Sequence, residues 1–330
     1  MQLLSIALPT WNKAVLLDYF LAVHAPRFQK YGVPLHIADN GSTDDTPQIC
    51  LNWAARFDVI RVHRFEEHVS VDQNFHRALL LPESRYVWLF GDGYEISEVM
   101  LLRAIDLLSS DTQYDHVTTN LVSLSTDRVG REYRTASDVA RDLPWLMTCV
   151  SCNIYGERLL SQSHFERFYN SNGLQAAIAL DFMRNRDFCF YFAPQVSVVT
   201  LKCPNYRKTG WGHDYFEVSF NKFPRLILML IDQLTVEEQV IALNEFFVRT
   251  PIFGWRHLLN MRAQGWLQSA SISKYRSTIR ALTPWHFRLL LFAMNFLPRC
   301  TAVILTRLID SVRKYNYMLQ SHFGSWREGR

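Results

Sequence analysis

Short apolar runs alternate with longer amphipathic segments through the first third of the chain. The apolar runs have the length of strands and occupy residues 3–8, 35–38, 59–63 and 86–90. Between and after them, helical periodicity predicts helices at residues 13–25, from Thr46, at 71–80 and at 98–108. Alternation of short strands with helices is typical of a mostly parallel sheet with crossover helices, so the pattern predicts an α/β fold.

The pattern changes after the first third of the chain. Residues 117–124 and 189–201 predict further strand regions, the second interrupted by Pro194, and a loop containing proline and glycine follows at 202–214. Helical periodicity then begins near residue 225 and continues to the end, punctuated by prolines. We therefore expect a sheet domain over residues 1–215 and an α-helical C-terminal region over residues 216–330.

Polar residues stand at the ends of the first two predicted strands. The first strand leads into Pro9-Thr10-Trp11-Asn12 without a GxGxxG turn, which argues against a dinucleotide-binding fingerprint. The second leads into Asp39-Asn40-Gly41-Ser42. A carboxylate accepts a hydrogen bond from an imide or amide N–H, and an asparagine both donates and accepts, so this loop suits the edge of a nucleobase. The alternative is that these residues only form a turn and cap the following helix.

The run at residues 86–90 ends in Gly91-Asp92-Gly93-Tyr94-Glu95 and delivers an acid to the carboxyl end of a strand. Ligands of open α/β sheets bind outside the carboxyl ends of the strands, which favours a ligand site at Asp92. The alternative is that Asp92 and Glu95 cap the helix that starts near Ser97.

Taken together, the segments LSIALPTWNK, IADNGSTDDT and VDQNFHRALLLPESRYVWLFGDG resemble the N-terminal signature of family 2 glycosyltransferases with the GT-A fold. A weaker likeness, extending to about residue 220, is to bacterial O-antigen glycosyltransferases of the abequosyltransferase type. The resemblance implies that the nucleotide of a nucleotide-sugar donor is bound by Pro9, Thr10, Asn12, Asp39, Asn40, Ser42 and, by position, Asn74.

The resemblance also implies an enzyme that transfers one sugar to a hydroxyl of a lipid-linked oligosaccharide in O-antigen or other surface polysaccharide biosynthesis. An alternative is a capsule or exopolysaccharide glycosyltransferase that uses a different sugar. An alternative of another class is a non-catalytic module that only binds a nucleotide-sugar.

In the family, a cluster of acids holds a divalent cation that bridges the two phosphates of the donor. The acid cluster of this chain departs from that pattern. Asp92 matches the first acid, but Gly93 and Tyr94 stand where further acids are expected. One hypothesis is that Asp92 and Glu95 hold Mg²⁺ or Mn²⁺, which carboxylate oxygens suit. The other is that the leaving group is stabilised without a metal, by cations drawn from a set in this chain: Arg77, Lys202, Arg207, Lys208 and His213.

The chain also departs from the family pattern at the residues expected to supply the catalytic base. Many inverting members carry a Glu-Asp pair late in the sheet domain, but residues 168–175 contain no acid. A sugar hydroxyl needs a base to take its proton as it attacks. We expect Asp214 in this role, with His213 as a phosphate contact or alternative base; Asp181 and Glu95 are further candidates.

Charge is distributed unevenly along the chain. Residues 249–330 hold 13 of the 35 Lys and Arg residues but only two acids, a net charge of +11, which leaves −7 for the remainder. After Pro298, apolar residues from Ile304 to Leu319 fall on one helical face and Arg307, Arg313 and Lys314 on the other. A basic amphipathic helix predicts attachment to an anionic membrane surface; the alternative is a helix packed on the protein body.

Partners and location follow from the same observations. The acidic body lacks a recognisable nucleic-acid-binding module, so nucleic acid is not an expected partner. The N-terminal apolar run has the length of a strand rather than of a signal peptide, and the six scattered cysteines do not indicate a disulfide framework. We therefore expect a cytoplasmic protein, peripheral on the cytoplasmic face of the inner membrane.

Overall fold

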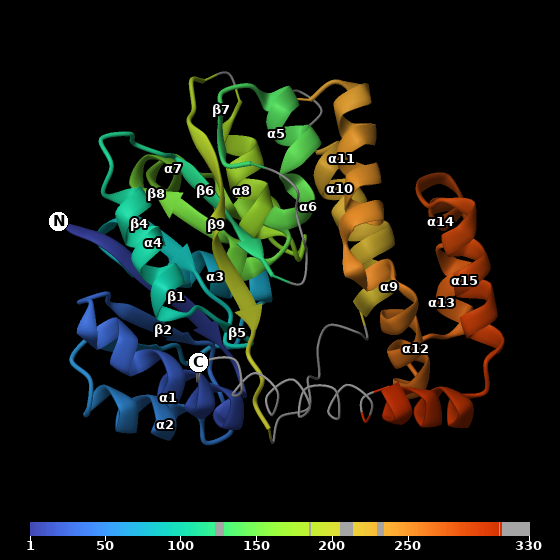
Figure 1. The fold of residues 1–330 in the computed structure, drawn as a ribbon, viewed down its shortest axis with the longest axis horizontal. Helices are drawn as coiled ribbons and strands as arrows, with labels where there is room; N and C mark the ends of the chain where they lie inside the picture. Colours follow the sequence, from blue (N-terminus) through green and yellow to red (C-terminus); the bar gives the residue numbers. More distant parts are fainter. Residues whose placement is uncertain (123–128, 185, 205–213, 230–233, 310, 312–330) are drawn as a thin grey trace, which may run out of the picture. The chain divides into compact units, whose positions relative to one another are not determined.

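The chain forms two compact units in the computed structural model, which describes all residues except 123–128, 185, 205–213, 230–233, 310 and 312–330. Unit 1 comprises residues 1–208 and 222–249, and unit 2 comprises residues 209–221 and 250–330. Unit 1 contains the sheet and unit 2 is helical (Figure 1).

The core of unit 1 is a nine-stranded sheet in which eight strands follow the order β3-β2-β1-β4-β8-β6-β9-β5, while β7 pairs with β9. The strands are β1 (Gln2–Thr10), β2 (Leu35–Asp39), β3 (Ile60–Arg64), β4 (Ser84–Leu89), β5 (Tyr94–Glu95), β6 (His116–Leu121), β7 (Arg131–Tyr133), β8 (Asn153–Gly156) and β9 (Phe190–Thr200). Strands β1 to β4, β6 and β9 run in one direction, whereas β5, β7 and β8 run antiparallel to their neighbours. The predicted α/β class with a mostly parallel sheet is confirmed.

Helices cover the sheet of unit 1. They are α1 (Ala14–Lys30), α2 (Thr46–Ala54), α3 (Val71–Leu79), α4 (Glu98–Leu108), α5 (Ala136–Asp142), α6 (Pro144–Met147), α7 (Glu157–Ser161), α8 (Leu174–Phe182), α10 (Phe223–Leu228) and α11 (Val236–Arg249), with 3-10 turns η1 (Val150–Cys152) and η2 (Phe165–Phe168). Local sequence explains several starts: Ser70 and Gln73 form a capping box on α3, and the Ser97 hydroxyl caps α4. Satisfying these free N–H groups fixes where each helix begins.

The central strand β1 is buried along most of its length because both its faces are covered. Its parallel register with β2 places Ile6 beside Leu35 and Thr10 beside Asp39. On the other side, Ala7 of β1 pairs with Leu89 of β4. The carboxyl ends of β1, β2 and β4 therefore lie next to one another.

The sequence predicted that Pro194 interrupts the strand region at residues 189–201, but the structure differs. Strand β9 is one strand that continues through Pro194, opposite β6. The register moves from Thr119 opposite Ala193 to Asn120 opposite Ser197, so the proline lies in a bulge where its missing N–H breaks no ladder pair.

Helices α10 and α11 belong to unit 1, whereas the sequence predicted a boundary near residue 215. Helix α11 packs against α5 and α6, as Figure 1 shows, and the Phe223 ring of α10 stacks on Phe246 of α11 with ring centroids 3.9 Å apart. The observed division therefore differs from the expected one because this apolar helix pair completes the core beside the sheet.

Unit 2 is built from short helices with its own aromatic core. They are α9 (Tyr215–Glu217), the π-helical turn η4 (Val218–Lys222), η5 (Pro251–Phe253), α12 (Trp255–Gln264), α13 (Ser269–Lys274), α14 (Arg276–Leu282), α15 (Trp285–Phe296) and a helix over Arg299–Ile309. Lys222, the last residue of η4, already belongs to unit 1. Phe220 packs its ring edge-on against Phe253, which contacts Phe287 of α15 in the same way. The predicted amphipathic helix after Pro298 extends beyond the described residues, so the interpretation of its last part stays a prediction.

Candidate functional site

The carboxyl ends of β1, β2 and β4 bring together several of the residues that the sequence singled out. The Asn40 N–H donates to the Thr10 carbonyl at 3.0 Å, and the Thr10 hydroxyl donates to Asp92 Oδ2 at 3.4 Å. Thr10, Asp39 and Asn40 are all buried, and Pro9 lies buried in β1 opposite Ala38. Residues from three separate segments thus form one polar cluster at this edge of the sheet.

Asn12 joins the loops that follow β1 and β2. Its backbone N–H donates to Ser42 Oγ at 2.9 Å, and its side-chain Oδ1 accepts from the Thr43 N–H at 2.7 Å. Asn12 has a left-handed backbone (φ 48°), which asparagine tolerates better than most residues. Gly41 in the second loop is also left-handed (φ 70°), and a Cβ there would lie 3.2 Å from the Glu66 carbonyl oxygen, so both loops depend on residues suited to this geometry.

Asp39 is fully buried, yet only one of its carboxylate oxygens has a hydrogen bond. Oδ1 accepts from the Ser42 N–H at 3.0 Å, whereas Oδ2 has no hydrogen-bond partner among the described residues. Arg64 Nε lies 3.9 Å from Oδ2. A buried acceptor without a donor costs about 1–3 kcal/mol. Oδ2 is therefore available to a ligand that carries an N–H group.

A shallow cavity of about 520 Å³ has walls that come from the loop after β2, the start of α2 and Arg64, and Asp39 itself does not line it. Ser42 and Arg64, the two residues that contact the Asp39 carboxylate, both line it. Asp44, also in its wall, accepts hydrogen bonds from the N–H groups of Ala14 and Thr46. Burial raises the pKa of Asp44, but these hydrogen bonds and one from the Thr46 side chain outweigh it, and the net pKa is lowered. Asp44 thus remains an anion that orders the loop.

Two predicted asparagines differ in what their side chains do. The Asn40 side-chain amide forms two hydrogen bonds with the Val69 backbone. Its Nδ2 donates to the Val69 carbonyl at 2.8 Å, and its Oδ1 accepts from the Val69 N–H at 3.0 Å. Asn40 therefore positions the loop before α3. Asn74 on α3 is buried, and its Oδ1 has no hydrogen-bond partner among the described residues. Its predicted nucleotide contact stays a prediction.

Trp11 stands where the resembled family usually has tyrosine, and the sequence predicted either an aromatic wall or ordinary packing for it, but it did not indicate its partner His68. The Trp11 ring, 46% exposed, lies 4.3 Å from the His68 ring between centroids. His68 Nδ1 lies 3.2 Å from the Asn40 carbonyl oxygen, which ties the pair to the second loop. Trp11 thus has an exposed face with a fixed neighbour, as a stacking wall requires.

The turn that carries Asp92 rests on η1. The Gly91 N–H donates to Ser151 Oγ at 3.0 Å, and a Cβ on Gly91 would lie 2.9 Å from Val150 Cγ1. The neighbouring Cys149 thiol, together with burial, raises the pKa of Tyr94 well above its usual range, which keeps the phenol neutral. Local spacing could not indicate this support, because Ser151 of η1 lies 60 residues further along the chain.

Glu95, the second predicted metal ligand, is engaged elsewhere. Its carboxylate forms an ion pair with Arg27 of α1 at 3.3 Å, and the same guanidinium donates to the Ile96 carbonyl at 2.7 Å. No group of three or more metal-ligating side chains occurs in the part of the chain that the structure describes. Of the two acids, only Asp92 has a described contact within the strand-end cluster, through Thr10.

The predicted catalytic bases are not brought into this cluster by any described contact. Asp214 is exposed and directly precedes α9 in unit 2, and His213 lies outside the described residues. Asp181 forms an ion pair with Arg167 at 2.7 Å. The assignment of the base stays a prediction.

The cationic side chains proposed to stabilise the leaving group are likewise not joined to the strand-end cluster by any described contact. Arg77 donates to the Glu67 carbonyl at 3.1 Å and lies over the Phe65 ring. Arg207 and Lys208, like His213, lie outside the described residues.

The loop before α8, where the family pattern places its acid pair, is held by a residue that the sequence did not single out. Asp72 on α3 is fully buried and accepts from the N–H groups of Asn172 at 2.9 Å and Leu174 at 3.2 Å. Burial raises the pKa of Asp72, and these hydrogen bonds oppose the rise. Asn170 and Asn172 both have left-handed backbones (φ 67° and 54°), so the acid from α3 and two asparagines shape this loop together.

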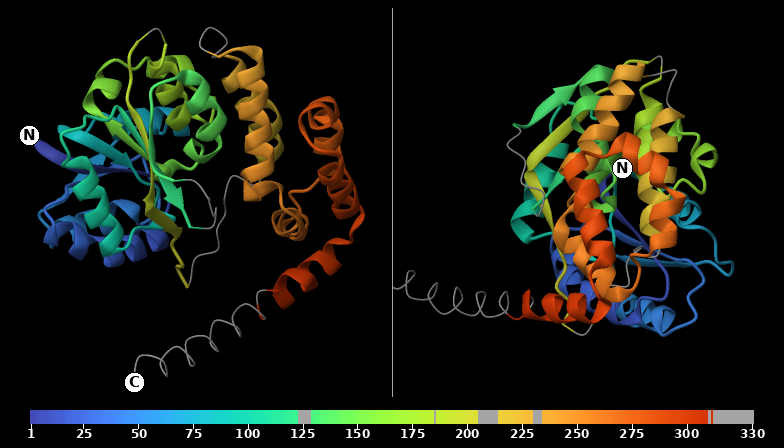
Figure 2. Two further views of the ribbon diagram at one scale, coloured as in Figure 1. Left: turned by 45° about the horizontal axis from the view of Figure 1, so that its top comes forward. Right: turned by 90° about the vertical axis from the view of Figure 1, so that its right-hand side faces the viewer.

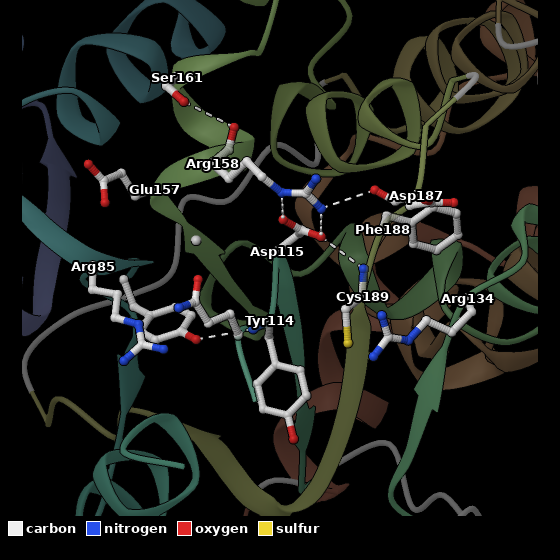
Figure 3. A pocket seen from close by; sticks show the side chains of 13 residues that line it. Arg85, Tyr114, Asp115, Arg134, Glu157, Arg158, Ser161, Asp187, Phe188 and Cys189 are labelled. Carbon is white, nitrogen blue, oxygen red and sulfur yellow. Dashed lines mark hydrogen bonds and ion pairs between the residues drawn. The ribbon is translucent and has the colours of Figure 1, made fainter. Parts of the chain in front are cut away.

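A second cavity of about 550 Å³ lies at the opposite ends of the strands (Figure 3). There Arg158 contacts both oxygens of Asp115, at 2.7 and 2.5 Å, and Asp115 also accepts from the Cys189 N–H. Burial raises the pKa of Cys189 to about 11, so this thiol is not a ready nucleophile. Protein groups satisfy both oxygens of Asp115, whereas Asp39 Oδ2 has no hydrogen-bond partner among the described residues.

Comparison with solved structures identifies the architecture. The structure resembles S. aureus TarS 1-349 in complex with UDP-GlcNAc (TM-score 0.55, 16% identity, covering 96% of this chain and 92% of that chain). It also resembles the mannosyltransferase PcManGT from Pyrobaculum calidifontis in complex with GDP-Man and Mn²⁺ (TM-score 0.54, 13% identity, covering 92% and 86%). The chain has the GT-A fold. No protein-family model and no curated protein matches it by sequence.

Proposed function

We propose that this protein is a glycosyltransferase that moves a single sugar from a nucleotide-sugar donor to an acceptor hydroxyl. The observation that carries the proposal is the buried Asp39 Oδ2 at the carboxyl end of β2, which has no hydrogen-bond donor among the described residues. Two residues that contact this carboxylate, Ser42 and Arg64, line a cavity. A nucleobase N–H supplies the missing donor. The GT-A fold supports this assignment, since both similar structures are complexes with a nucleotide-sugar.

The sugar leaves a nucleoside diphosphate whose charge must be stabilised. Mg²⁺ is commonly held by one or two carboxylates together with substrate phosphates, so the single acid Asp92 fits such an ion. When bound, a divalent cation neutralises the charge that develops on the phosphates. Asp92 would hold it, while Glu95 keeps its ion pair with Arg27 and steadies the turn.

The acceptor in this proposal is a lipid-linked oligosaccharide of O-antigen or related surface polysaccharide biosynthesis, at the cytoplasmic face of the inner membrane. The basic C-terminal region supports a membrane-bound acceptor, because its net charge of +11 over residues 249–330 attracts anionic lipid. Asp214 or His213 would take the proton from the acceptor hydroxyl.

One observation favours a non-catalytic nucleotide-sugar-binding module instead. Glu95 is paired with Arg27, which leaves the turn with fewer free acids than the family pattern. Turnover distinguishes the two functions, because only an enzyme releases nucleoside diphosphate from its donor.

The experiment has two steps. Thermal shifts with UDP, CDP, GDP and dTDP identify the base, since a ligand that binds only the folded state raises its stability. The corresponding nucleotide-sugars are then incubated with protein and a membrane extract that supplies acceptor, and nucleoside diphosphate is measured. Stabilisation with release supports the transferase, whereas stabilisation without release supports the binding module. No stabilisation by any nucleotide contradicts both.

A further inference from the structure

Helix α15 presents four large apolar side chains on one exposed face. Trp285, Leu289, Phe292 and Phe296 are 66%, 60%, 64% and 67% exposed. Their spacing of four, three and four residues places them along one stripe of an α-helix. The opposite face of the same helix is buried through Phe287 and Leu291. Helix α15 therefore already has an inward apolar face, and this stripe is a second one.

The following helix extends the apolar exposure. Ile304 and Leu308 are each 57% exposed in the helix Arg299–Ile309, whose other face carries the fully buried Ala302. This helix turns by 111° from α15, and the turn is visible in Figure 2. Among the described residues, no single helix combines the length and apolarity of a membrane span, although these two together have the required composition. The sharp turn favours two helices that lie along a surface.

The segment that contains these helices is rich in positive charge and poor in carboxylate partners. Residues 250–309 contain no Asp or Glu but eight basic residues: Arg256, Arg262, Lys274, Arg276, Arg280, Arg288, Arg299 and Arg307. Within the described part of unit 2, Lys274 alone forms an ion pair with a carboxylate, that of Glu217. Arg262, Arg288 and Arg299 donate instead to backbone carbonyls, which leaves their charge uncompensated.

We propose that the stripe Trp285, Leu289, Phe292 and Phe296 is a docking surface for an anionic lipid bilayer, with α15 lying in the plane of the interface. A helix with an apolar face, interfacial aromatic residues and flanking cations binds lipid in this orientation. A second copy of the chain is a poorer occupant, because it would bring two sets of uncompensated cations together. Anionic headgroups neutralise those cations while the acyl boundary accepts the stripe.

This surface deepens the proposed function, on whose membrane-linked acceptor it rests. It assigns membrane attachment to described residues of α15, upstream of the basic residues at the end of the chain. Its test does not depend on sugar transfer.

The test is co-sedimentation of the full chain with vesicles of phosphatidylcholine alone or mixed with phosphatidylglycerol. We expect binding to the mixed vesicles at low salt, partial release by high salt, and little binding to phosphatidylcholine alone. The triple variant Leu289→Ser, Phe292→Ser, Phe296→Ser should bind at least about tenfold more weakly, because three apolar side chains no longer enter lipid. The control Val99→Ser, Leu102→Ser removes exposed apolar groups from α4 in unit 1 and should bind as the wild type does.

A second measurement covers the case in which the triple variant does not fold. Brominated acyl chains should quench part of the wild-type tryptophan fluorescence, and Trp285→Phe should lose that part of the quenching while still binding vesicles. Absence of quenching in the wild type, or unchanged quenching in Trp285→Phe, would overturn the proposal.

Three further outcomes would contradict the assignment of the stripe to a lipid surface. Unchanged vesicle binding by the folded triple variant excludes the stripe as the lipid contact. Wild-type dimers that the triple variant abolishes would assign the stripe to a second copy, and resistance to alkaline carbonate would assign the helix pair to a buried span. Nucleotide stabilisation of the triple variant is measured in parallel, so a failure of the lipid surface is distinguished from a failure of the donor site.

Discussion

The backbone N–H of Asn12 donates a 2.9 Å hydrogen bond to the hydroxyl of Ser42, 30 residues further along the chain. The Asn12 side chain adds a second link to the same loop, through the Thr43 N–H. Two loops that follow adjacent parallel strands are thereby held as one structure, with the Asp39 carboxylate at its base. The candidate site is preorganised by these links before any ligand arrives.

Substitution of Asn12 should separate its two contributions. Asn12→Ala removes the side-chain hydrogen bonds, at about 0.5–1.5 kcal/mol each, and also puts alanine in the left-handed region, which asparagine tolerates better than alanine does. Asn12→Gly loses only the hydrogen bonds. We expect Asn12→Ala to lower the free energy of unfolding more than Asn12→Gly does, as measured by urea denaturation. Equal losses would show that backbone strain at this position is unimportant.

Asp39→Asn should weaken nucleotide binding without unfolding the protein. The amide has the same shape, but it either turns an NH₂ group towards the ligand or loses the bond from the Ser42 N–H. Loss of a hydrogen bond to a charged acceptor costs roughly 1.5–3 kcal/mol, which is at least about a tenfold rise in Kd. Titration calorimetry with the nucleotide that stabilises the wild type measures it.

The matched control for that experiment is Asp58→Asn. Asp58 is an exposed acid before β3 that does not line the cavity beside Ser42 and Arg64. It should leave Kd unchanged. A similar loss in both variants would mean that the general negative charge of unit 1 matters rather than the Asp39 carboxylate.

The two acids after β4 should differ in their effect on transfer. If Asp92 holds a divalent cation, EDTA abolishes nucleoside diphosphate release and Mn²⁺ or Mg²⁺ restores it, and Asp92→Asn reduces release sharply. Glu95→Gln should retain most activity, and loss of its ion pair with Arg27 should cost only about 0–1 kcal/mol of stability. Full activity in EDTA would indicate a metal-independent enzyme. A greater loss in Glu95→Gln than in Asp92→Asn would reverse the assignment.

Acid should destabilise unit 1 through two buried histidines. Burial lowers the pKa of His24 and of His116 to about 3, against 6.5 in the unfolded chain. Since the unfolded state binds the proton more tightly, this stability is fully present above pH 6.5 and is lost as the pH falls towards 3. The slope is up to roughly 1.4 kcal/mol per pH unit for each histidine. Urea denaturation at a series of pH values measures it.

His24→Gln should reduce that slope. In the wild type, His24 Nε2 accepts from the Ile96 N–H at 3.2 Å while Nδ1 bonds the Phe20 carbonyl, so a proton on Nε2 breaks the link from α1 to the residue after β5. Glutamine retains an acceptor that does not titrate. His286→Gln, at an exposed position in unit 2, is the control and should leave the slope unchanged. An identical slope in wild type and His24→Gln would refute the role of His24.

Sequence reasoning found the strands whose apolar runs are long and bounded by turns, and it located helix 98–108 at its observed bounds. It missed β8, because the four residues Asn153–Gly156 carry too few apolar side chains to form a pattern. Their strand conformation comes from antiparallel pairing with β4 and β6. Such pairing depends on the tertiary fold and leaves little trace in local sequence.

The candidate site also combines features that local sequence predicts with features that depend on the tertiary fold. The rule that ligands bind at strand ends brought Thr10, Asp39 and Asp92 to one edge, since it depends only on strand order and direction. The rule could not show that Asn40 is occupied by Val69, or that Glu95 is occupied by Arg27. Those partners come from other elements, 29 and 68 residues away, and local spacing carries no information about them.

The interleaving of the two units constrains how the protein can be divided. The chain leaves unit 1 at residue 208, re-enters it at 222 and leaves it again at 249. A truncation after residue 215 would therefore remove α10 and α11 and expose the faces of α5 and α6 that α11 covers. No single cut yields a complete unit 1, and during synthesis its core cannot close until residues 222–249 have been made. An expression fragment of the sheet unit alone would need residues 209–221 replaced by a short linker and the chain ended after Arg249.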